Sequence, residues 1–150
     1  MKVDPFARIP TPPCADLLGW RLLDHDAARG WVRVGFEGRA SFLNPAGFVQ
    51  GGFLAAMLDD AMGPAVWVKS GGALYSPTID MHVRYLAPAR AGAFTAEAEV
   101  VQLGKSIAFI EGRLFDAEGI EVARASASAR LVPVARALAQ ERSSAAFGAK

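Results

Sequence analysis

The chain has 150 residues, of which 52% are hydrophobic, and its 16 Lys and Arg residues against 15 Asp and Glu give a formal net charge of +1. This is the length of one ordinary domain, and the apolar content is enough for a core and excludes a chain that is disordered throughout. The near-neutral charge excludes a protein that coats nucleic acid, which needs a clustered basic excess. Cys14 is the single cysteine and His25 and His82 are the two histidines, so the sequence predicts neither an internal disulfide nor a metal site.

No segment of the sequence has the signature of a signal peptide or of a membrane span. Prolines and charged residues interrupt the N-terminal region, and nowhere do about 18 apolar residues follow one another without a charge. We therefore expect a soluble, cytoplasmic protein that does not associate with membranes.

The first half of the chain predicts an arm, a strand and one long helix. Four prolines prevent regular structure in residues 1–14, and a helical turn is expected over 15–18. Alternating apolar and polar residues predict a strand over 31–36. A turn at 44–47 then leads to the long helix, which is predicted to run from about 51 to 68.

The second half predicts four strands separated by hairpin-length turns, at 78–86, 94–101, 106–115 and 120–132. Connections this short favour antiparallel pairing. Alanines occupy one face of the last strand, and such small side chains let a helix approach a sheet closely. The sequence thus predicts an α+β domain over 15–133, with one long central helix wrapped by a curved antiparallel sheet of five to six strands.

One helix does not cover every face and edge of such a sheet. We therefore expect protomers to join their sheets edge to edge, giving a homodimer or a homotetramer. Residues 134–150 form a C-terminal tail, either as a short helix or as a loose segment.

The long helix has two distinct faces when about 100° is allowed per residue. Its predicted core stripe consists of Phe53, Leu54, Met57, Ala61 and Pro64. A second, narrow face has only small residues around one acid, and its members are Gly52, Ala56, Asp59 and Gly63. This face is either a ligand slot that holds Asp59 or a surface for close packing. Asp60 lies beside the core stripe, where it is expected to pair with an arginine.

The start of this helix, Gln50-Gly51-Gly52, offers unbonded N–H groups at the positive end of the helix dipole, with no side chain at two positions. Such an end can polarise a carbonyl group or hold an oxyanion. The simpler alternative is a tight junction between loop and helix.

Several of these residues also follow a fixed spacing: Asn44, a glycine three residues on at Gly47, the Gln50-Gly51-Gly52 start, and an acid fifteen residues on at Asp59. Further motifs are Leu17-Leu18-Gly19, Asp80-Met81-His82-Val83-Arg84-Tyr85, Gly104-Lys105-Ser106 and the alternating alanines of the last strand. In this order they resemble the hotdog-fold acyl-CoA thioesterases of the phenylacetate-degradation (PaaI-like) type, within the 4-hydroxybenzoyl-CoA thioesterase superfamily. The resemblance covers roughly 15–132. Gln50 departs from it, because the family usually has histidine there.

The resemblance implies a mechanism for hydrolysing an acyl-CoA thioester. The Gly51 N–H polarises the thioester carbonyl, and Asp59, supplied by the partner subunit's helix, activates water as a general base or attacks as the nucleophile. Asn44 positions the water or Asp59, Thr78 helps to hold the water, and Gln50 orients the thioester without titrating. The resemblance implies no metal and no cofactor other than the coenzyme A of the substrate.

Coenzyme A carries phosphates, so the resemblance also implies basic residues at the mouth of the pocket. The candidates are Lys105 with the adjacent Ser106, then Arg90 and Arg113, with Arg124 and Arg130 behind them. For the acyl group, which would enter beside Gly52, the candidates are Phe42, Phe48, Met62 and Trp67. Each of these residues has a simpler alternative, as a solvated surface charge or as part of the core.

Two other functions share parts of the pattern. A hotdog dehydratase or hydratase needs a catalytic histidine paired with an acid, and no histidine falls on or near the central helix. A non-catalytic acyl-CoA-binding or regulatory domain would keep the fold and the Gly-Gly helix start, but it gains nothing from a carboxylate at Asp59. His25 is expected to be exposed in a turn, His82 to pair with Asp80, and Cys14 to have no catalytic role.

Overall fold

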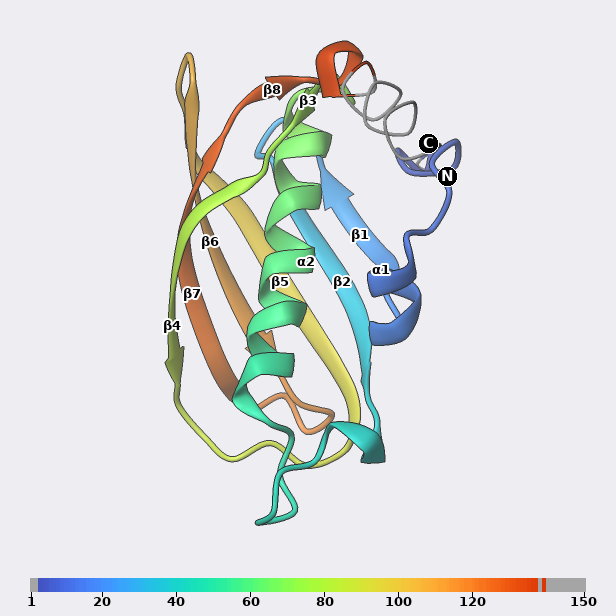
Figure 1. Cartoon of the computed structure of the whole chain (residues 1–150), viewed down its shortest axis with the longest axis vertical. Coiled ribbons are helices and arrows are strands. Elements are labelled where there is room, and N and C mark those ends of the chain that lie inside the picture. The colour runs from blue at the N-terminus through green and yellow to red at the C-terminus, as the bar shows by residue number, and fades with distance from the viewer. Residues whose placement is uncertain (1–2, 138, 140–150) are drawn as a thin grey trace, which may run out of the picture.

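The computed structural model describes residues 3–137 and residue 139. One long helix, α2 (Gly51–Lys69), lies in the hollow of a six-stranded antiparallel sheet (Figure 1). The strands of this sheet are β1 (Arg21–Asp26), β2 (Trp31–Gly38), β4 (Thr78–Tyr85), β5 (Gly92–Leu103), β6 (Ile107–Phe115) and β7 (Glu121–Arg130). The α+β architecture predicted from the sequence is confirmed.

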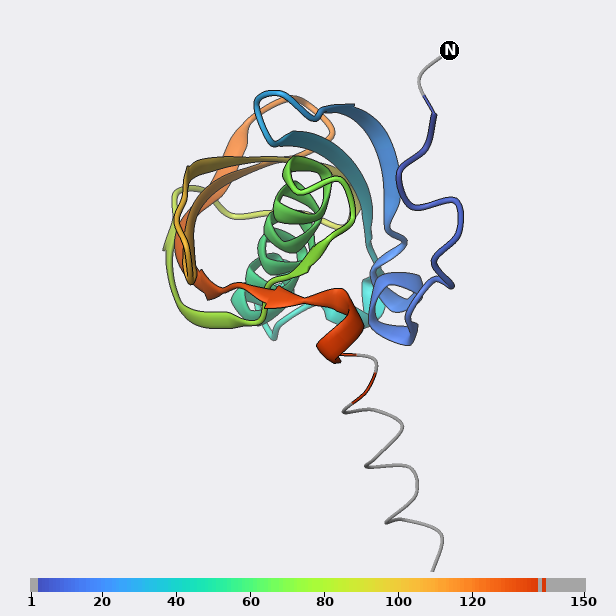
Figure 2. The ribbon, with the colours of Figure 1, turned by 90° about the horizontal axis from the view of Figure 1, so that it is seen from above.

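The strand order is β1-β2-β5-β6-β7-β4, so β1 and β4 are the two edges of the sheet. Figure 2 shows how strongly the sheet curves around α2. The remaining elements are α1 (Pro13–Leu18), the short 3-10 helix η1 (Ala40–Phe42), β3 (Leu74–Tyr75) and β8 (Val132–Pro133), the last two of which pair with each other. Strand β1 is an element that the sequence does not predict.

The core lies between α2 and the sheet. The apolar residues of α2 that are buried there include Leu58 and Met62, whereas Phe53 and Pro64 of the predicted stripe are only half-buried. The buried face of α2 is therefore rotated toward Leu58 and Met62 relative to the predicted stripe. The sequence does not fix this rotation, because the helix is apolar nearly all round. Close approach depends on small residues in the sheet, since a Cβ on Gly112 would lie 3.2 Å from the side chain of Leu58.

Pro64 interrupts the hydrogen-bond ladder of α2 and creates a link to the N-terminal region. Proline has no N–H, so the Asp60 carbonyl lacks the partner that it would have four residues on. The Trp20 indole N–H donates to this carbonyl at 3.0 Å and so ties the segment between α1 and β1 to the helix. Phe6 packs edge-on against Trp20, with 5.3 Å between the ring centroids.

The two ends of the described chain can be compared with the predicted arm and tail. Helix α1 begins at Pro13, two residues before the predicted turn, and its C-cap residue Gly19 has a φ of 68°. Residues 3–12 contain no helix or strand, and residues 134–137 are helical. Apart from residue 139, the predicted tail beyond 137 lies outside the described residues.

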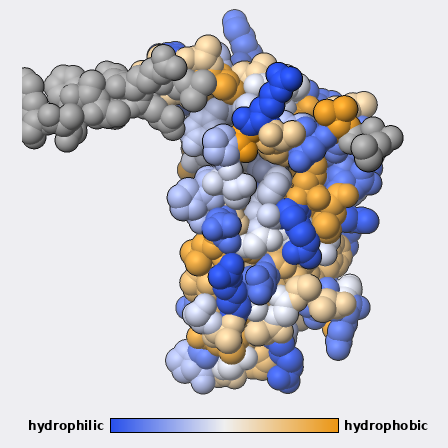
Figure 3. Space-filling view, turned by 90° about the vertical axis from the view of Figure 1, so that its right-hand side faces the viewer, coloured by the Kyte–Doolittle hydropathy of each residue, from blue (hydrophilic) through white to orange (hydrophobic). Residues whose placement is uncertain are grey.

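The surface on the side of α1 and the N-terminal arm mixes hydrophilic and hydrophobic residues (Figure 3). Among the helices of the described residues, none combines the length and apolar character that crossing a bilayer requires.

Candidate active site

The loop before α2 is shaped by Asn44. Its Oδ1 accepts hydrogen bonds from the backbone N–H groups of Ala46 at 3.0 Å and Phe48 at 3.1 Å, and Gly47 adopts a φ of 83°. These bonds close a tight turn that leads into the helix start. Within one protomer no hydrogen bond joins Asn44 to Asp59, so the direct contact that Asn44 shows is with its own loop.

The first turn of α2 has unbonded donors. Phe53 N–H and Leu54 N–H donate back to the Gln50 carbonyl, at 2.9 and 3.4 Å, whereas the N–H groups of Gly51 and Gly52 precede the helical ladder. Gln50 is exposed and its side chain makes no capping bond. Among the described residues, the N-terminus of α2 therefore has two N–H groups without a hydrogen-bond acceptor, next to an exposed amide side chain.

The two glycines face different environments. A Cβ on Gly51 would lie 3.1 Å from the ring of Tyr85, whose hydroxyl donates to the Gly51 carbonyl at 3.0 Å. A Cβ on Gly52 would have no heavy atom of the described chain within 4 Å. Gly52 thus leaves the approach to the helix start open, while Gly51 accommodates a neighbouring ring. The sequence does not single out Tyr85 beyond its place in a family motif.

Asp59 and Thr78 lie together within one protomer. The Thr78 hydroxyl, at the start of β4, donates to Asp59 Oδ1 at 2.7 Å, and both residues are exposed. Gly63, on the same narrow face of α2, also has open space where a Cβ would lie. Within one protomer the predicted slot is therefore an open surface with a carboxylate whose orientation is fixed by one hydrogen bond.

Asp60 has quite different surroundings, and the prediction that it pairs with an arginine is wrong. It is half-buried, and its Oδ2 is a buried oxygen with no hydrogen-bond partner among the described residues. Burial, and secondarily the charge of Asp59, raises the pKa of Asp60 to about 6. The physical reason is that Asp60 faces the side of α2 that Trp20 covers. Arginines pair instead with glutamates of the sheet, among them Arg33, Arg113 and Arg124.

The predicted substrate-binding residues divide between the two ends of the molecule. Phe48 and Arg90 lie together near the start of α2, with the guanidinium 5.6 Å from the ring centroid, and Val49 N–H donates to the Ala89 carbonyl to join their loops. Lys105 and Ser106 lie in the turn between β5 and β6, at the end of the molecule where α2 finishes (Figure 1). One protomer therefore does not bring Lys105 to Gly51.

Three of the four residues proposed for an acyl pocket are structural. Phe42 is buried and stacks on Phe53 with 4.0 Å between ring centroids, and Met62 is buried beneath β6. The Trp67 indole N–H donates to the Pro5 carbonyl at 3.2 Å. The structure shows these three residues packed within the protomer, which is the simpler alternative. Phe48, the fourth, lies close to the helix start.

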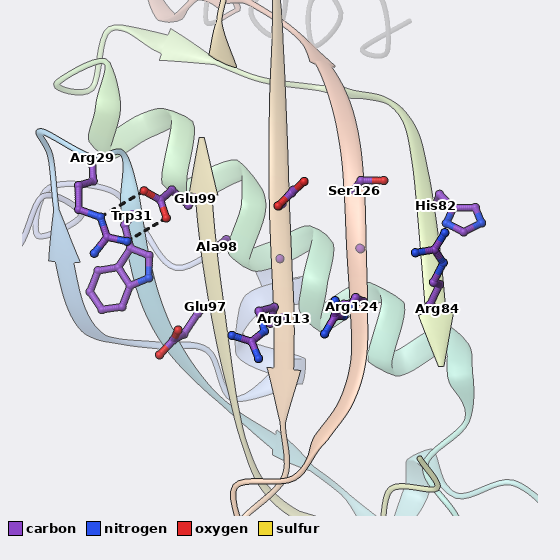
Figure 4. Close-up of a pocket in the computed structure, with 13 residues that line it drawn as sticks. Arg29, Trp31, His82, Arg84, Glu97, Ala98, Glu99, Arg113, Arg124 and Ser126 are labelled. Carbon is purple, nitrogen blue, oxygen red and sulfur yellow. Dashed lines mark hydrogen bonds and ion pairs between the residues drawn. The ribbon is translucent and has the colours of Figure 1, made fainter. Parts of the chain in front are cut away.

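A groove of about 450 Å³ lies away from these residues, on the outer face of the sheet (Figure 4). Its walls include Arg113 and Arg124, which both bond Glu121 at 2.7 Å and, with Arg113 first, hold the pKa of that carboxyl below its ordinary value. Both predicted phosphate ligands are thus engaged in ion pairs. Arg130 is exposed at the end of β7.

The groove also contains His82, whose predicted pairing with Asp80 is wrong. Asp80 Oδ1 accepts a hydrogen bond from the Ser128 hydroxyl at 2.6 Å. No hydrogen bond or ion pair joins Asp80 to His82. His25 is half-buried in β1 rather than exposed in a turn. Among residues 3–137 and 139, no three or more His, Cys, Asp or Glu side chains are grouped so as to hold a metal ion.

Comparison with known proteins agrees with this architecture. A family model described as the thioesterase superfamily matches residues 46–123. A phenylacetic acid degradation-related protein of Ralstonia eutropha is 30% identical, with a TM-score of 0.79 over 84% of this chain and 95% of that one. A variant of the phenylacetic acid degradation protein PaaI of Thermus thermophilus is 26% identical, with a TM-score of 0.71 over 81% of this chain and 100% of that one.

A protein of Streptococcus mutans, solved bound to acetyl CoA, shares the fold at 20% identity, with a TM-score of 0.67 over 76% of this chain and 89% of that one. No curated protein sequence matches the chain. The chain belongs to the thioesterase superfamily and has the hotdog fold of its PaaI-like members. It is an enzyme that hydrolyses thioesters, as the sequence predicts.

Proposed function

We propose that the protein hydrolyses an acyl-CoA thioester to a free acid and coenzyme A, and that Asp59 and the Gly51 N–H act on the substrate. The observation that carries this proposal is the Asp59–Thr78 hydrogen bond of 2.7 Å on an open face of the helix whose first N–H groups are unbonded. A binding protein would have no use for an oriented carboxylate beside an electron-rich thioester. The acetyl CoA bound by the Streptococcus mutans protein supports the choice of thioester.

In the proposed reaction, the Gly51 N–H donates to the thioester oxygen and stabilises the negative charge that develops there. Asp59 accepts a proton from water, whose oxygen bonds to the carbonyl carbon. The carbon–sulfur bond then breaks, and the proton passes to the sulfur of coenzyme A. Direct attack by Asp59, followed by hydrolysis of the resulting anhydride, is the alternative. A thioester is already an activated acyl group, so no step is routed through a metal or a cofactor.

The two groups must come from different protomers. Gly51 and Asp59 are separated by eight residues of α2, which is about 12 Å along the helix axis. The reacting carbonyl and the attacking water, in contrast, must lie about 3 Å apart. A complete site therefore needs Asp59 from a second copy of the chain, and this supports a homo-oligomer built from dimers.

Strand β4 is the edge through which we propose that the two copies join. It is an outer strand of the sheet, and its Ile79 is 58% exposed. Asp80 and Arg84 lie symmetrically about His82, so antiparallel pairing centred on His82 places each Asp80 opposite the partner's Arg84. In this pairing, the end of one protomer that carries Lys105 lies beside the end of the other that carries Gly51. This arrangement supports a role for Lys105 and Ser106 in phosphate binding, alongside Arg90.

The alternative is a non-catalytic acyl-CoA-binding domain, for which the specific observation is Gln50 in place of histidine. Thiol release from a panel of acyl-CoAs, followed with a chromogenic thiol reagent, separates the two. Our proposal, which includes the predicted cytoplasmic location, expects turnover of at least one acyl-CoA by the native protein. Micromolar binding without turnover would establish the alternative, and a monomeric mass at micromolar protein concentration would contradict the shared site.

A further inference from the structure

Tyr85 is the last residue of β4, and it contacts the first turn of α2 in two ways. Its hydroxyl donates to the Gly51 carbonyl at 3.0 Å. Its ring lies so close to Gly51 that a Cβ there would be 3.1 Å from two ring carbons and 3.3 Å from the hydroxyl oxygen. A side chain at residue 51 would crowd the tyrosine ring and force it to move by a few tenths of an ångström.

The hydrogen bond fixes one particular peptide group. The Gly51 carbonyl belongs to the same planar peptide as the Gly52 N–H, and the ring rests on the Cα to which the Gly51 N–H is attached. Neither glycine has a side chain that would limit its own backbone freedom. A peptide whose carbonyl accepts a hydrogen bond is also polarised, which strengthens its N–H as a donor.

We propose that Tyr85 is a positioning residue for the thioesterase reaction, holding the Gly51–Gly52 peptide so that the unbonded N–H groups of α2 stay aimed at the thioester oxygen. The inference rests on the proposed function, which gives these N–H groups their role. Tyr85 is 53% exposed, and an exposed contact of this kind contributes little to folding. Its contribution is therefore to the orientation of the donors rather than to the core.

The chain offers a matched control, because its other tyrosine, Tyr75, is exposed to a similar extent, 55%, and lies in β3. The test compares kcat and KM of the native protein, Tyr85→Phe and Tyr75→Phe with the best acyl-CoA substrate. Loss of one hydrogen bond that acts in the transition state should lower kcat of Tyr85→Phe by about 2- to 12-fold. KM should stay within about twofold, and Tyr75→Phe should match the native protein in both constants.

Two readouts separate positioning from a structural effect. A thioether analogue of the substrate has no carbonyl oxygen, so it should bind native protein and Tyr85→Phe with equal affinity. Gly51→Ala should lower kcat much more in the native protein than in a Tyr85→Ala background, where the added methyl group has room. Equal losses in the two backgrounds would show that Tyr85 and residue 51 act independently, which would contradict the inference.

An unchanged kcat in Tyr85→Phe, with the native protein active and Asp59→Asn inactive, would overturn the inference and leave the proposed function standing. A rise in KM at constant kcat, or weaker binding of the thioether, would also overturn it. If the native protein releases no thiol from any acyl-CoA, the proposed function fails and the role of Tyr85 fails with it.

Discussion

The two sides of α2 carry neighbouring aspartates in opposite surroundings. On the side of β4, Asp59 is exposed, it accepts a hydrogen bond from Thr78, and Gly52 and Gly63 leave the helix surface open. On the side of α1, Asp60 is half-buried, with one carboxyl oxygen that has no partner in the described part of the chain. Consecutive residues of a helix are rotated by about 100° about its axis. This one step takes the carboxylate from an accessible surface, where a hydrogen bond orients it, to a partly buried environment of low dielectric constant.

Under the proposed function, this difference separates the residues of α2 that act on the substrate from those that stabilise the fold. The α1 side is held by aromatic contacts, including Trp20 on the Asp60 carbonyl and the stacked pair of Phe42 and Phe53. On the β4 side, the aromatic contact of Tyr85 is confined to the first turn, and the space beside Gly52 and Gly63 is open within the protomer. This leaves room for a substrate and for a second copy. Changes on the β4 side should therefore affect turnover with the fold intact, and changes on the α1 side should affect stability with turnover nearly intact.

On the open side, a large change is expected from Gly52→Val, second to that of replacing Asp59 itself. The new side chain enters space that is empty in the protomer, so the fold should tolerate it. It should obstruct the approach of the thioester to the helix start and lower kcat/KM by about 10²-fold, the size of effect that a small misplacement of reacting groups produces. The check is steady-state thiol release together with the thermal unfolding midpoint. Native turnover in this variant would show that the substrate does not pass Gly52.

On the packed side, Trp20→Phe should destabilise the protein. Phenylalanine keeps most of the ring but lacks the indole N–H, so the Asp60 carbonyl, already without a helical partner because of Pro64, loses its donor. A part-buried acceptor left unsatisfied costs about 1–3 kcal/mol of unfolding free energy, which chemical denaturation measures. The kcat of the folded fraction should change little. An unchanged unfolding free energy would mean that water replaces the indole.

Asp60→Asn should stabilise the protein at neutral pH. The folded-state pKa of about 6 lies above the ordinary value of 3.8, so the folded protein binds a proton more tightly than the unfolded chain. Native stability should therefore fall as the pH rises through this window, and the loss is complete above it. Removing the charge should recover about 1–2 kcal/mol, because partial exposure lets solvent screen part of the penalty. Denaturation of both proteins at several pH values tests this, and a variant whose stability still falls over the same window would assign the titration to another group.

The smallest effects are expected at Gln50, at the open end of the helix. Gln50→Ala should lose one orienting hydrogen bond worth about 0.5–1.5 kcal/mol, which is a rate loss of roughly tenfold or less. Gln50→His should remain active. The native pH–rate profile should show no limb from an imidazole near about 6.5. Restoration of hydrolysis by Gln50→His in an otherwise inactive protein would favour the binding domain instead.

The sequence predicts those features that depend on one segment or on fixed spacing. The periodicity of residues 51–68 and the alternation in the second half predict α2 and β4 to β7, and the spacing from Asn44 to Asp59 predicts the helix start and its acid. Strand β1 is missed because it is short, with charged residues among its few apolar ones. The burial of Asp60 is missed because it depends on Trp20, forty residues away, reaching a carbonyl that Pro64 leaves without a partner.

The position of Lys105 is likewise beyond sequence reasoning, since the turn between β5 and β6 reaches the far end of the molecule only because β5 and β6 are long. The contact between Tyr85 and Gly51 joins the end of an edge strand to the start of the helix. The sequence indicates this contact only through Gly51, a glycine whose backbone conformation does not require glycine.

The central claim is that Asp59 and Asp60 divide catalysis and stability between them. Its most direct test is the ratio of kcat/KM for Asp59→Asn and Asp60→Asn, measured side by side by thiol release with one acyl-CoA. Removing the base should lower turnover by about 10²–10⁴-fold in Asp59→Asn with folding intact, whereas Asp60→Asn should stay within about tenfold of the native protein. Equal losses, or a larger loss in Asp60→Asn, would contradict the assignment of the catalytic carboxylate to the open side of α2.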